Sequence, residues 1–206
     1  MEDSGVVLFE VPGLYQVIRF LPLRRTANVS FDFFPLRAIP PIDAIDRVIH
    51  GPGAFSPGSV GEVERPWYMH PHQDDHLLVL HGTRDVEIYT PAHGRIERFV
   101  VQPDRIEMNG ELLYDGAGVL VWPCGVFHRV ISREQGSASI NLATHHEGFD
   151  IDTNFNVYDV DVATGRFRCV REGHLDQGGR RCTRIAHTGG EVPGKDAKKP
   201  VIEASQ

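Results

Sequence analysis

Residues 67–82 read WYMHPHQDDHLLVLHG, and this stretch decides the fold. It places His70, His72 and His76 at even positions and then runs through four aliphatic residues. Successive side chains of a β-strand point to opposite faces, so residues at even positions share one face. We therefore expect a strand whose histidines lie near the mouth of a barrel, with Leu78 and Leu80 pointing into its interior.

The rest of the chain carries further signals of short strands. Its 206 residues include 21 glycines and 14 prolines, spread along the chain, and 41% of the residues are hydrophobic. After residue 67, turn residues recur roughly every 8 to 12 positions between β-branched segments, a pattern typical of a sandwich or barrel. We predict an all-β fold with minor helical content, in which residues 41–49 form at most one short helical turn.

The length fits one domain with extensions. We expect residues 1–64 to form N-terminal strands and a loop that pack on a core barrel of residues 65–150. Residues 151–188 are expected to form C-terminal strands or an extension, with a hairpin turn at 163–165. Residues 189–206 are polar and rich in glycine, proline and lysine, so we expect a flexible tail there.

The formal net charge of -7 argues against nucleic acid and anionic membranes as partners, because both favour a basic surface. No apolar run approaches the roughly 18 residues that span a bilayer, and the start of the chain lacks a basic segment before a hydrophobic one. Cys124, Cys169 and Cys182 lie far apart without a CxxC pair, which indicates reduced thiols. We expect a cytoplasmic protein.

Histidines grouped on one strand face indicate a metal site. Neutral imidazoles that pack side by side need partners for both ring nitrogens, and a divalent cation bound by several of them meets that need. A further histidine follows the turn at Pro123 and Gly125 and begins a second strand. The predicted ligands are His70, His72, His76 and His128. Imidazole ligands suit zinc, which we place first, and also iron or nickel.

The first histidine group resembles one of the two signature motifs of the cupin superfamily, a double-sheet jelly-roll barrel. That motif has the form H-x-H, three or four residues, Glu, and a glycine about six residues later. Here His70, Pro71 and His72 are followed after three residues by His76 and then by Gly82. A histidine thus replaces the usual glutamate, and the glycine spacing is one residue short.

The second cupin motif contains P-x-G-x-x-H, which Pro123, Gly125 and His128 match. Ser132 stands where an asparagine often follows. The resemblance covers residues 65–146 and implies an RmlC-like, single-domain, metal-binding cupin. Its fold would be an all-β double-stranded β-helix, or jelly roll, with extra N-terminal strands.

Several residues near the histidines leave alternatives open. His76 is either a ligand or a neighbour of the ligands, in which case three histidines and water complete the site. Asp74 shares the histidine face and could orient a ligand, whereas Asp75 and His81 are expected to face solvent. Either histidine of the pair at 145–146 could reach the barrel mouth.

Tyr68 has the parity of the expected ligands and is therefore the candidate catalytic residue, as proton donor or substrate anchor. Apolar walls around a metal at the barrel mouth suit a small-molecule substrate or ligand. The resemblance to cupins also implies a homodimer joined through N-terminal strands, with residues 6–11 and 14–23 supplying the edge.

Two functions of different classes remain open. One is a metal-dependent enzyme that acts on a small oxygenated or carboxylated metabolite, through lyase, cyclase or isomerase chemistry or as a dioxygenase. The other is a metal-holding, ligand-binding or sensory module without turnover, which the fold alone does not exclude. A tetrahedral site closed by four histidines would favour the second function, whereas three ligands and water would favour the first.

Overall fold

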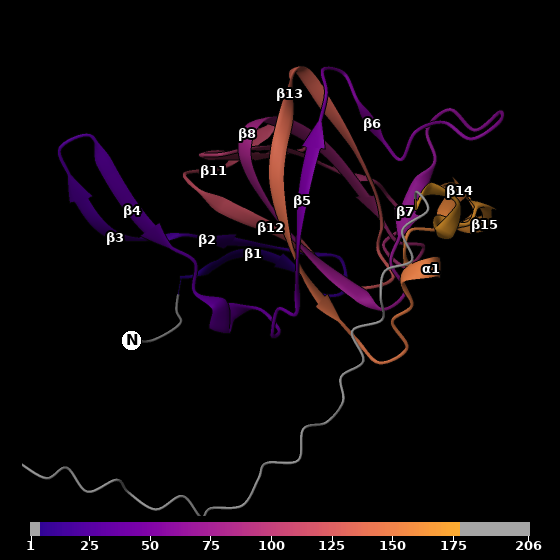
Figure 1. Cartoon of the computed structure of the whole chain (residues 1–206), viewed down its shortest axis with the longest axis horizontal. Coiled ribbons are helices and arrows are strands. Elements are labelled where there is room, and N and C mark those ends of the chain that lie inside the picture. Colours follow the sequence, from indigo (N-terminus) through magenta and orange to yellow (C-terminus); the bar gives the residue numbers. More distant parts are fainter. Residues whose placement is uncertain (1–4, 178–206) are drawn as a thin grey trace, which may run out of the picture.

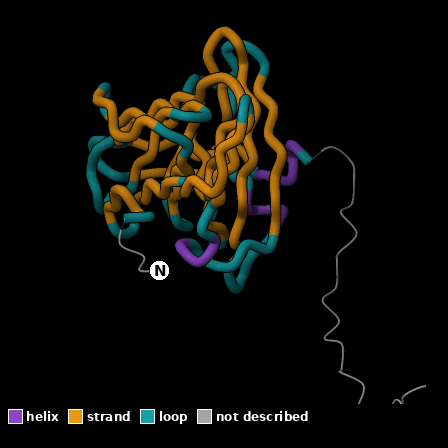
Figure 2. The backbone as a smooth tube through the Cα atoms, turned by 90° about the vertical axis from the view of Figure 1, so that its left-hand side faces the viewer, coloured by secondary structure: helices purple, strands orange, loops and turns teal. Residues whose placement is uncertain are grey.

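The computed structural model describes residues 5–177, and these residues form an almost entirely β structure (Figures 1 and 2). The strands are β1 (Val7–Val11), β2 (Tyr15–Arg19), β3 (Leu21–Thr26), β4 (Val29–Phe33), β5 (Ala44–His50), β6 (Phe55–Ser56), β7 (Trp67–Met69), β8 (Gln73–Tyr89), β9 (Glu97–Gln102), β10 (Arg105–Met108), β11 (Glu111–Asp115), β12 (Gly118–Trp122), β13 (Phe127–His145), β14 (Val157–Asp161) and β15 (Arg166–Arg171). The short helical elements are η1 (Leu36–Ala38), α1 (Ile151–Asn154) and η2 (Gly173–Asp176). The prediction of an all-β jelly roll is confirmed.

Two long antiparallel strands, β8 and β13, form the frame of the barrel. Residues 127–132 of β13 pair with residues 84–89 of β8, and residues 137–145 pair with residues 73–82. The register skips residues 133–136, so the pair bends there and belongs to both halves of the barrel. This is how a double-stranded β-helix is built. Figure 1 shows β5 alongside β13 on one wall.

The bend depends on two glycines that lie against each other. Gly82 has a φ of 70°, and a Cβ atom built there would lie 2.0 Å from the carbonyl oxygen of Gly136. Gly136 has a φ of 67°, and its Cβ would lie 2.5 Å from the carbonyl oxygen of His50. Only glycine combines a positive φ with so close a backbone approach. The glycine of the first cupin-like motif therefore marks the point where β8 crosses from one half of the barrel to the other.

The core fills the space between the two halves. β12 pairs with β8 and β2, and β9 pairs with the second half of β8. Their inward side chains form one buried hydrophobic cluster, which includes Leu77, Val86, Phe99 and Leu120. Burial of such aliphatic and aromatic groups contributes about 1.5–3 kcal/mol for each side chain. This cluster holds fixed the strands that carry the candidate site.

The helical turn predicted within residues 41–49 is wrong. Residues 44–50 form β5, which pairs residue by residue with β13, and continuous pairing outweighs a weak local helical preference. The side chains of β5 also reverse the usual arrangement, in which apolar groups point inward. Ile45 and Ile49 are 68% and 54% exposed, whereas Asp46 and His50 line an interior cavity. The inward face of β5 places Asp46, Val48 and His50 against this cavity.

The C-terminal hairpin predicted around residues 163–165 is confirmed, since β14 and β15 pair across that turn. The predicted tail at 189–206 and Cys182 lie outside the described residues. Cys124 and Cys169 are free and exposed. Among residues 5–177, no helix has the length and apolar character needed to cross a membrane.

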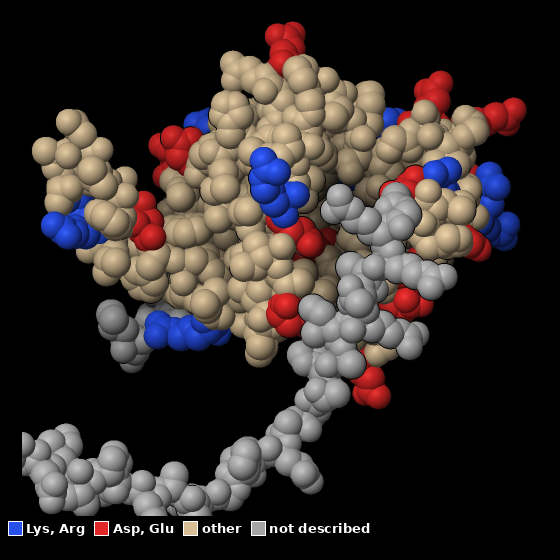
Figure 3. All heavy atoms as spheres, viewed as in Figure 1, with Lys and Arg blue, Asp and Glu red and all other residues tan. Residues whose placement is uncertain are grey.

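Charged groups of both signs are interspersed on the face seen in Figure 3, with broad uncharged areas between them. The hairpin of β3 and β4 projects from the barrel body, as Figure 1 shows. Its apolar side chains Leu23, Val29 and Phe31 are exposed.

Candidate metal centre

The residues of β8 that face the barrel interior are displaced by one position from those that the sequence predicts. The strand is broken between β7 and β8, where Pro71 and His72 form a bend, so the alternation does not continue from His70 into β8. Leu77 is 3% exposed and belongs to the barrel core, whereas Leu80 is 55% exposed. The prediction that Leu78 and Leu80 fill the interior is wrong, and in the first half of β8 the odd-numbered residues Asp75, Leu77 and Val79 point inward instead.

This shift brings Asp75 into the interior, between two of the predicted histidines. Nε2 of His70 lies 3.2 Å from Oδ2 of Asp75, and Nε2 of His128 lies 3.8 Å from the same oxygen. The three ligand atoms lie within 4.8 Å of one another, and all three residues are buried. We call this group the inner triad.

Both histidines of the inner triad are fixed through their second ring nitrogen. Nδ1 of His70 is hydrogen-bonded to the carbonyl oxygen of Asn154, and Nδ1 of His128 lies 3.2 Å from the carbonyl oxygen of Val126. A carbonyl oxygen only accepts, so each Nδ1 carries the hydrogen. Each Nε2 is then directed at the Asp75 carboxylate. Histidine ligands of metals commonly have this outer support.

The Asp75 carboxylate is held by its other oxygen. Oδ1 accepts hydrogen bonds from Nε2 of Gln73 at 2.6 Å and from Nδ2 of Asn141 at 2.7 Å. These two amides fix the plane of the carboxylate and leave Oδ2 facing the histidines. The group is therefore rigid before any ligand arrives.

The pKa values within the inner triad favour a charged pair of His70 and Asp75 beside a neutral His128. Burial lowers the pKa of His70, but the charge and hydrogen bond of Asp75 outweigh it, and the pKa lies above its ordinary value. Burial raises the pKa of Asp75, yet the opposing effect of His70 is stronger and the pKa is lowered. Burial and the charge of His70 lower the pKa of His128 to about 4. A proton on His70 therefore leaves Nε2 of His128 without a partner.

The structure does not bring the other two predicted ligands into this group. The ring of His72 lies against Gly148, in the bend between β7 and β8. His76 points to the opposite side of β8, where Nδ1 is hydrogen-bonded to the carbonyl oxygen of Leu142. Nε2 of His76 is buried and has no hydrogen-bond partner in the described part of the chain. The shifted parity explains both positions.

Asp75 is the residue that the sequence reasoning missed, since it was expected to face solvent. Its position could have been found by counting the alternation back from Val79 and Leu77 rather than forward from the histidines. Asp74, by contrast, points outward, where Oδ1 accepts a hydrogen bond from the backbone N–H of Cys124 and lies 2.9 Å from Nε2 of His146. His81 is exposed, as predicted.

The inner triad borders an interior cavity of about 330 Å³. Its apolar walls come from Leu77, Trp122, Val130 and Phe155. Tyr68 also lines it, with its ring stacked near that of His70 at a centroid distance of 6.3 Å. Burial raises the pKa of Tyr68, so its hydroxyl keeps its proton at neutral pH.

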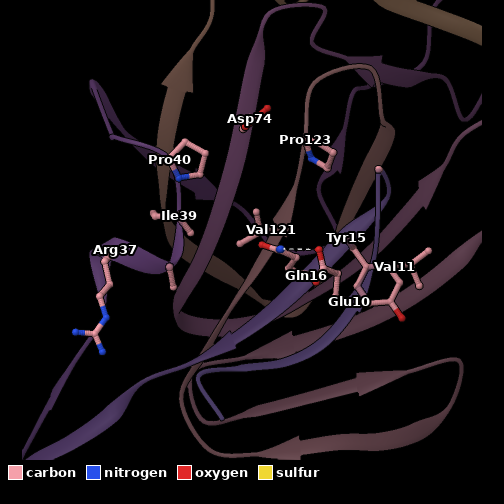
Figure 4. A pocket seen from close by; sticks show the side chains of 12 residues that line it. Glu10, Val11, Tyr15, Gln16, Arg37, Ile39, Pro40, Asp74, Val121 and Pro123 are labelled. Atoms are coloured by element: carbon pink, nitrogen blue, oxygen red, sulfur yellow. Dashed lines mark hydrogen bonds between the residues drawn. The ribbon is translucent and has the colours of Figure 1, made fainter. Parts of the chain in front are cut away.

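A second hollow lies on the outside of the barrel and contains no member of the inner triad (Figure 4). It has a volume of about 380 Å³ and lies between β1, β2, β8 and the segment at residues 37–40. Asp74 and Pro123 line it, and Gln16 donates a hydrogen bond to Glu10 beside them (Figure 4). Its wall combines exposed residues such as Glu10 and Arg37 with buried ones such as Tyr15 and Val121.

Fold and site together define a class: a jelly roll with a buried cluster of two histidines and one carboxylate. No family model matches the chain, and no curated protein matches it in sequence. Among solved structures, the chain is similar to the rmlC epimerase of Mycobacterium tuberculosis, at 11% identity and a TM-score of 0.48. That match covers 66% of this chain and 64% of the epimerase, so the chain spans less than two thirds of that protein's length.

Two other solved structures are similar in the same way. The dTDP-4-dehydrorhamnose 3,5-epimerase of Sulfolobus tokodaii is 17% identical, with 70% of this chain and 78% of that one covered and a TM-score of 0.48. A double mutant of the QdtA 3,4-ketoisomerase from Thermoanaerobacterium thermosaccharolyticum, in complex with TDP, is 16% identical, with 68% and 85% covered and a TM-score of 0.45. At these identities, the roles of residues depend on the geometry of this chain itself.

Proposed function

We propose that this protein is a metal-dependent enzyme whose divalent transition metal is held by His70, Asp75 and His128. The observation that carries the proposal is the convergence of three buried acceptor atoms within 4.8 Å, with both histidines fixed through Nδ1. The substrate class is a small oxygenated or carboxylated molecule, in keeping with the size and mixed walls of the adjoining cavity.

A cation fits this group better than a proton does. One proton shared by His70 and Asp75 still leaves the Nε2 lone pair of His128 facing a carboxylate oxygen 3.8 Å away. A divalent ion would satisfy all three acceptors at once, and two histidines with one carboxylate are a ligand set that zinc and iron(II) both accept.

Three protein ligands leave coordination positions open, which distinguishes an enzyme from a closed structural site. A bound zinc ion would supply Lewis acidity for lyase, cyclase or isomerase chemistry, and iron(II) would supply the oxygen chemistry of a dioxygenase. Tyr68 keeps its proton through burial and faces the same cavity, so it would act as proton donor or substrate anchor. Trp122 and Phe155 supply apolar walls to the same cavity.

The experiment is elemental analysis of the purified protein, followed by titration with zinc and iron(II). We expect about one equivalent of metal in the wild type and its loss in His70→Ala. His81→Ala is the matched control, because His81 is exposed on the same strand. Retention of metal by His72→Ala and His76→Ala would support the inner triad as the ligand set. Full metal content in His70→Ala, or none in the wild type, would overturn the proposal.

Conversion of a substrate distinguishes an enzyme from a non-catalytic, metal-holding module. With stoichiometric metal present, an enzyme should consume small 2-oxo acids, enols or hydroxy acids in a substrate screen, and Tyr68→Phe should reduce the rate while leaving the metal in place. Binding of such compounds without conversion, at unchanged metal content, would favour the ligand-binding or sensory module.

We also propose a homodimer and a cytoplasmic location. β1 lies at the edge of its sheet, and Val7 and Phe9 on it are exposed, as are Phe31 and Ile45 on nearby N-terminal strands. An exposed apolar edge of this kind favours pairing with a second copy. A monomer mass in light scattering would contradict the dimer, and secretion of the tagged chain would contradict the location.

A further inference from the structure

The cavity beside the inner triad contains a buried cation without a counter-charge. Arg84, on β8, is 4% exposed and lines this cavity. No carboxylate in residues 5–177 lies within ion-pair distance of its guanidinium, although salt bridges hold many surface arginines. Burial alone lowers the pKa of Arg84 to about 10, so the group remains charged at neutral pH. Buried charges are costly unless they are paired, which suggests a partner from outside the chain.

The guanidinium is oriented by two acceptors and leaves one nitrogen free. Nε donates to Oγ of Ser137 at 3.0 Å, and Nη2 donates to the carbonyl oxygen of Val48 at 3.2 Å. Nη1, with its two hydrogens, has no partner among the described residues. Nη1 of the guanidinium is therefore available to an acceptor in the cavity.

A chain of hydroxyls extends from Arg84 to a second donor. Oγ of Ser137 lies 2.6 Å from Oγ of Ser132, which lies 3.0 Å from Nδ1 of His50. Arginine only donates, so Ser137 accepts from it and donates to Ser132, which in turn donates to Nδ1 of His50. The reverse direction would leave the buried hydroxyl hydrogen of Ser137 without an acceptor.

This direction fixes the tautomer of His50. Burial lowers the pKa of His50 to about 4, so the ring is neutral, and an accepting Nδ1 places its single proton on Nε2. His50 lines the cavity, and its Nε2–H has no partner in the part of the chain that the structure describes. Two unpaired donors thus belong to the same wall of the cavity.

The donor wall and the inner triad lie at different ends of the cavity. Ser132, the strand partner of Arg84, is four residues from His128 along β13, which corresponds to roughly 13 Å of extended strand. The carboxylates Asp46 and Asp75 belong to the other end, where Asp46 pairs across strands with Asn141. The cavity is therefore polarised, with donors at one end and acceptors at the other.

We propose that Arg84 and His50 bind the anionic group, a carboxylate or phosphate, of the molecule that occupies this cavity. The inference deepens the proposed function and rests on it only for the reaction: the anion end lies at the donor wall, and the reacting end lies at the inner triad. Binding of the anion itself does not require a metal. The same substrate then spans both ends, which explains why β5 turns Asp46 and His50 inward.

The test is isothermal titration calorimetry with succinate and with inorganic phosphate, at constant ionic strength. We expect saturable binding of at least one of them to the wild type and a roughly 10- to 100-fold weaker affinity in Arg84→Gln, because a hydrogen bond to a charged group contributes about 1.5–3 kcal/mol. Arg133→Gln is the matched control, since Arg133 pairs with Asp85 at the surface. Preference for succinate identifies a carboxylate, and preference for phosphate identifies a phosphoryl group.

A second variant allows the proposal to be tested even if the first variant misfolds. If Arg84→Gln does not fold, His50→Phe removes the other donor and should weaken binding roughly 2- to 10-fold. Binding in His70→Ala without metal would support the anion site even if the proposed chemistry fails. The inference is overturned if neither anion binds the wild type, or if Arg84→Gln or His50→Phe binds as tightly as the Arg133→Gln control.

Discussion

Two adjacent carboxylates on β8 point to opposite sides of the barrel wall, and their surroundings differ. Asp75 faces the interior, where two amides hold one oxygen and two fixed histidines face the other. Asp74 faces outward, together with Cys124 and His146, whose ligand atoms also lie within 4.8 Å of one another. Proximity alone therefore does not distinguish the two groups.

Burial and outer support do distinguish them. The His146 side chain is 40% exposed and Cys124 is exposed. The structure shows no hydrogen bond that fixes the second ring nitrogen of His146 within the described residues. A metal site needs ligands whose positions are set before binding, and only the inner triad meets that requirement. The comparison leads to three predictions, from the largest expected effect to the smallest.

Removal of each carboxylate in turn should give the largest difference in the free energy of unfolding. Asp75→Ala leaves the amides of Gln73 and Asn141 without an acceptor and removes the counter-charge of His70, so we expect a loss of about 3–5 kcal/mol in the free energy of unfolding. Asp74→Ala should cost only about 1 kcal/mol, because its partner His146 is half exposed. Urea unfolding of both variants without added metal measures the difference. Equal losses would show that the inner triad is no better ordered than the outer group, which consists of Asp74, Cys124 and His146.

Acid should affect the interior more than the surface. The pKa of native His50 is about 4, below its ordinary value near 6.5, so the unfolded chain takes up a proton first. The contribution of His50 to stability is thus complete above about pH 6.5 and is lost as the pH falls towards 4, by about 1–3 kcal/mol after allowance for partial exposure.

Thermal unfolding from pH 7 to pH 4 provides the measurement for His50. His50→Asn should flatten the dependence of the melting temperature on pH, whereas His81→Asn should follow the wild type because His81 is exposed. Parallel curves for the wild type and His50→Asn would contradict the neutral, half-buried state of His50.

The smallest effect is expected at the outer group. Cys124→Ser keeps a small polar side chain on an exposed turn and should change the free energy of unfolding by less than about 0.5 kcal/mol. It should also leave the metal content of the purified protein unchanged. A halved zinc content in Cys124→Ser would mean that the outer group, and not only the inner triad, binds metal.

The sequence predicts the fold and half of the site for identifiable reasons. Recurrent turns and β-branched segments identify the all-β class, and Gly82 and the turn before His128 place the two long strands. The alternation rule fails between His70 and Gln73, because it holds only within an unbroken strand, and Pro71 interrupts this one. Counting across this break places His76 beside His70 and His128, whereas the structure places Asp75 there.

The donor wall was also out of reach of sequence reasoning. Arg84 and His50 are 34 positions apart and meet only because β5 and β8 both pair with β13. An isolated arginine within a strand pattern normally indicates a solvated face. Only the pairing register shows that this one points inward.

The hydroxyl chain between Arg84 and His50 has a consequence for what the cavity rejects. Since arginine has no acceptor, the hydrogen bonds along the chain run in one direction, and they leave Nη1 of Arg84 and Nε2 of His50 to donate to an incoming molecule. A primary ammonium group would meet the positive charge of Arg84 there, so amines are disfavoured at that end. Free metal ions are repelled from it for the same reason, and any cation that enters the barrel is confined to the end that carries the carboxylates.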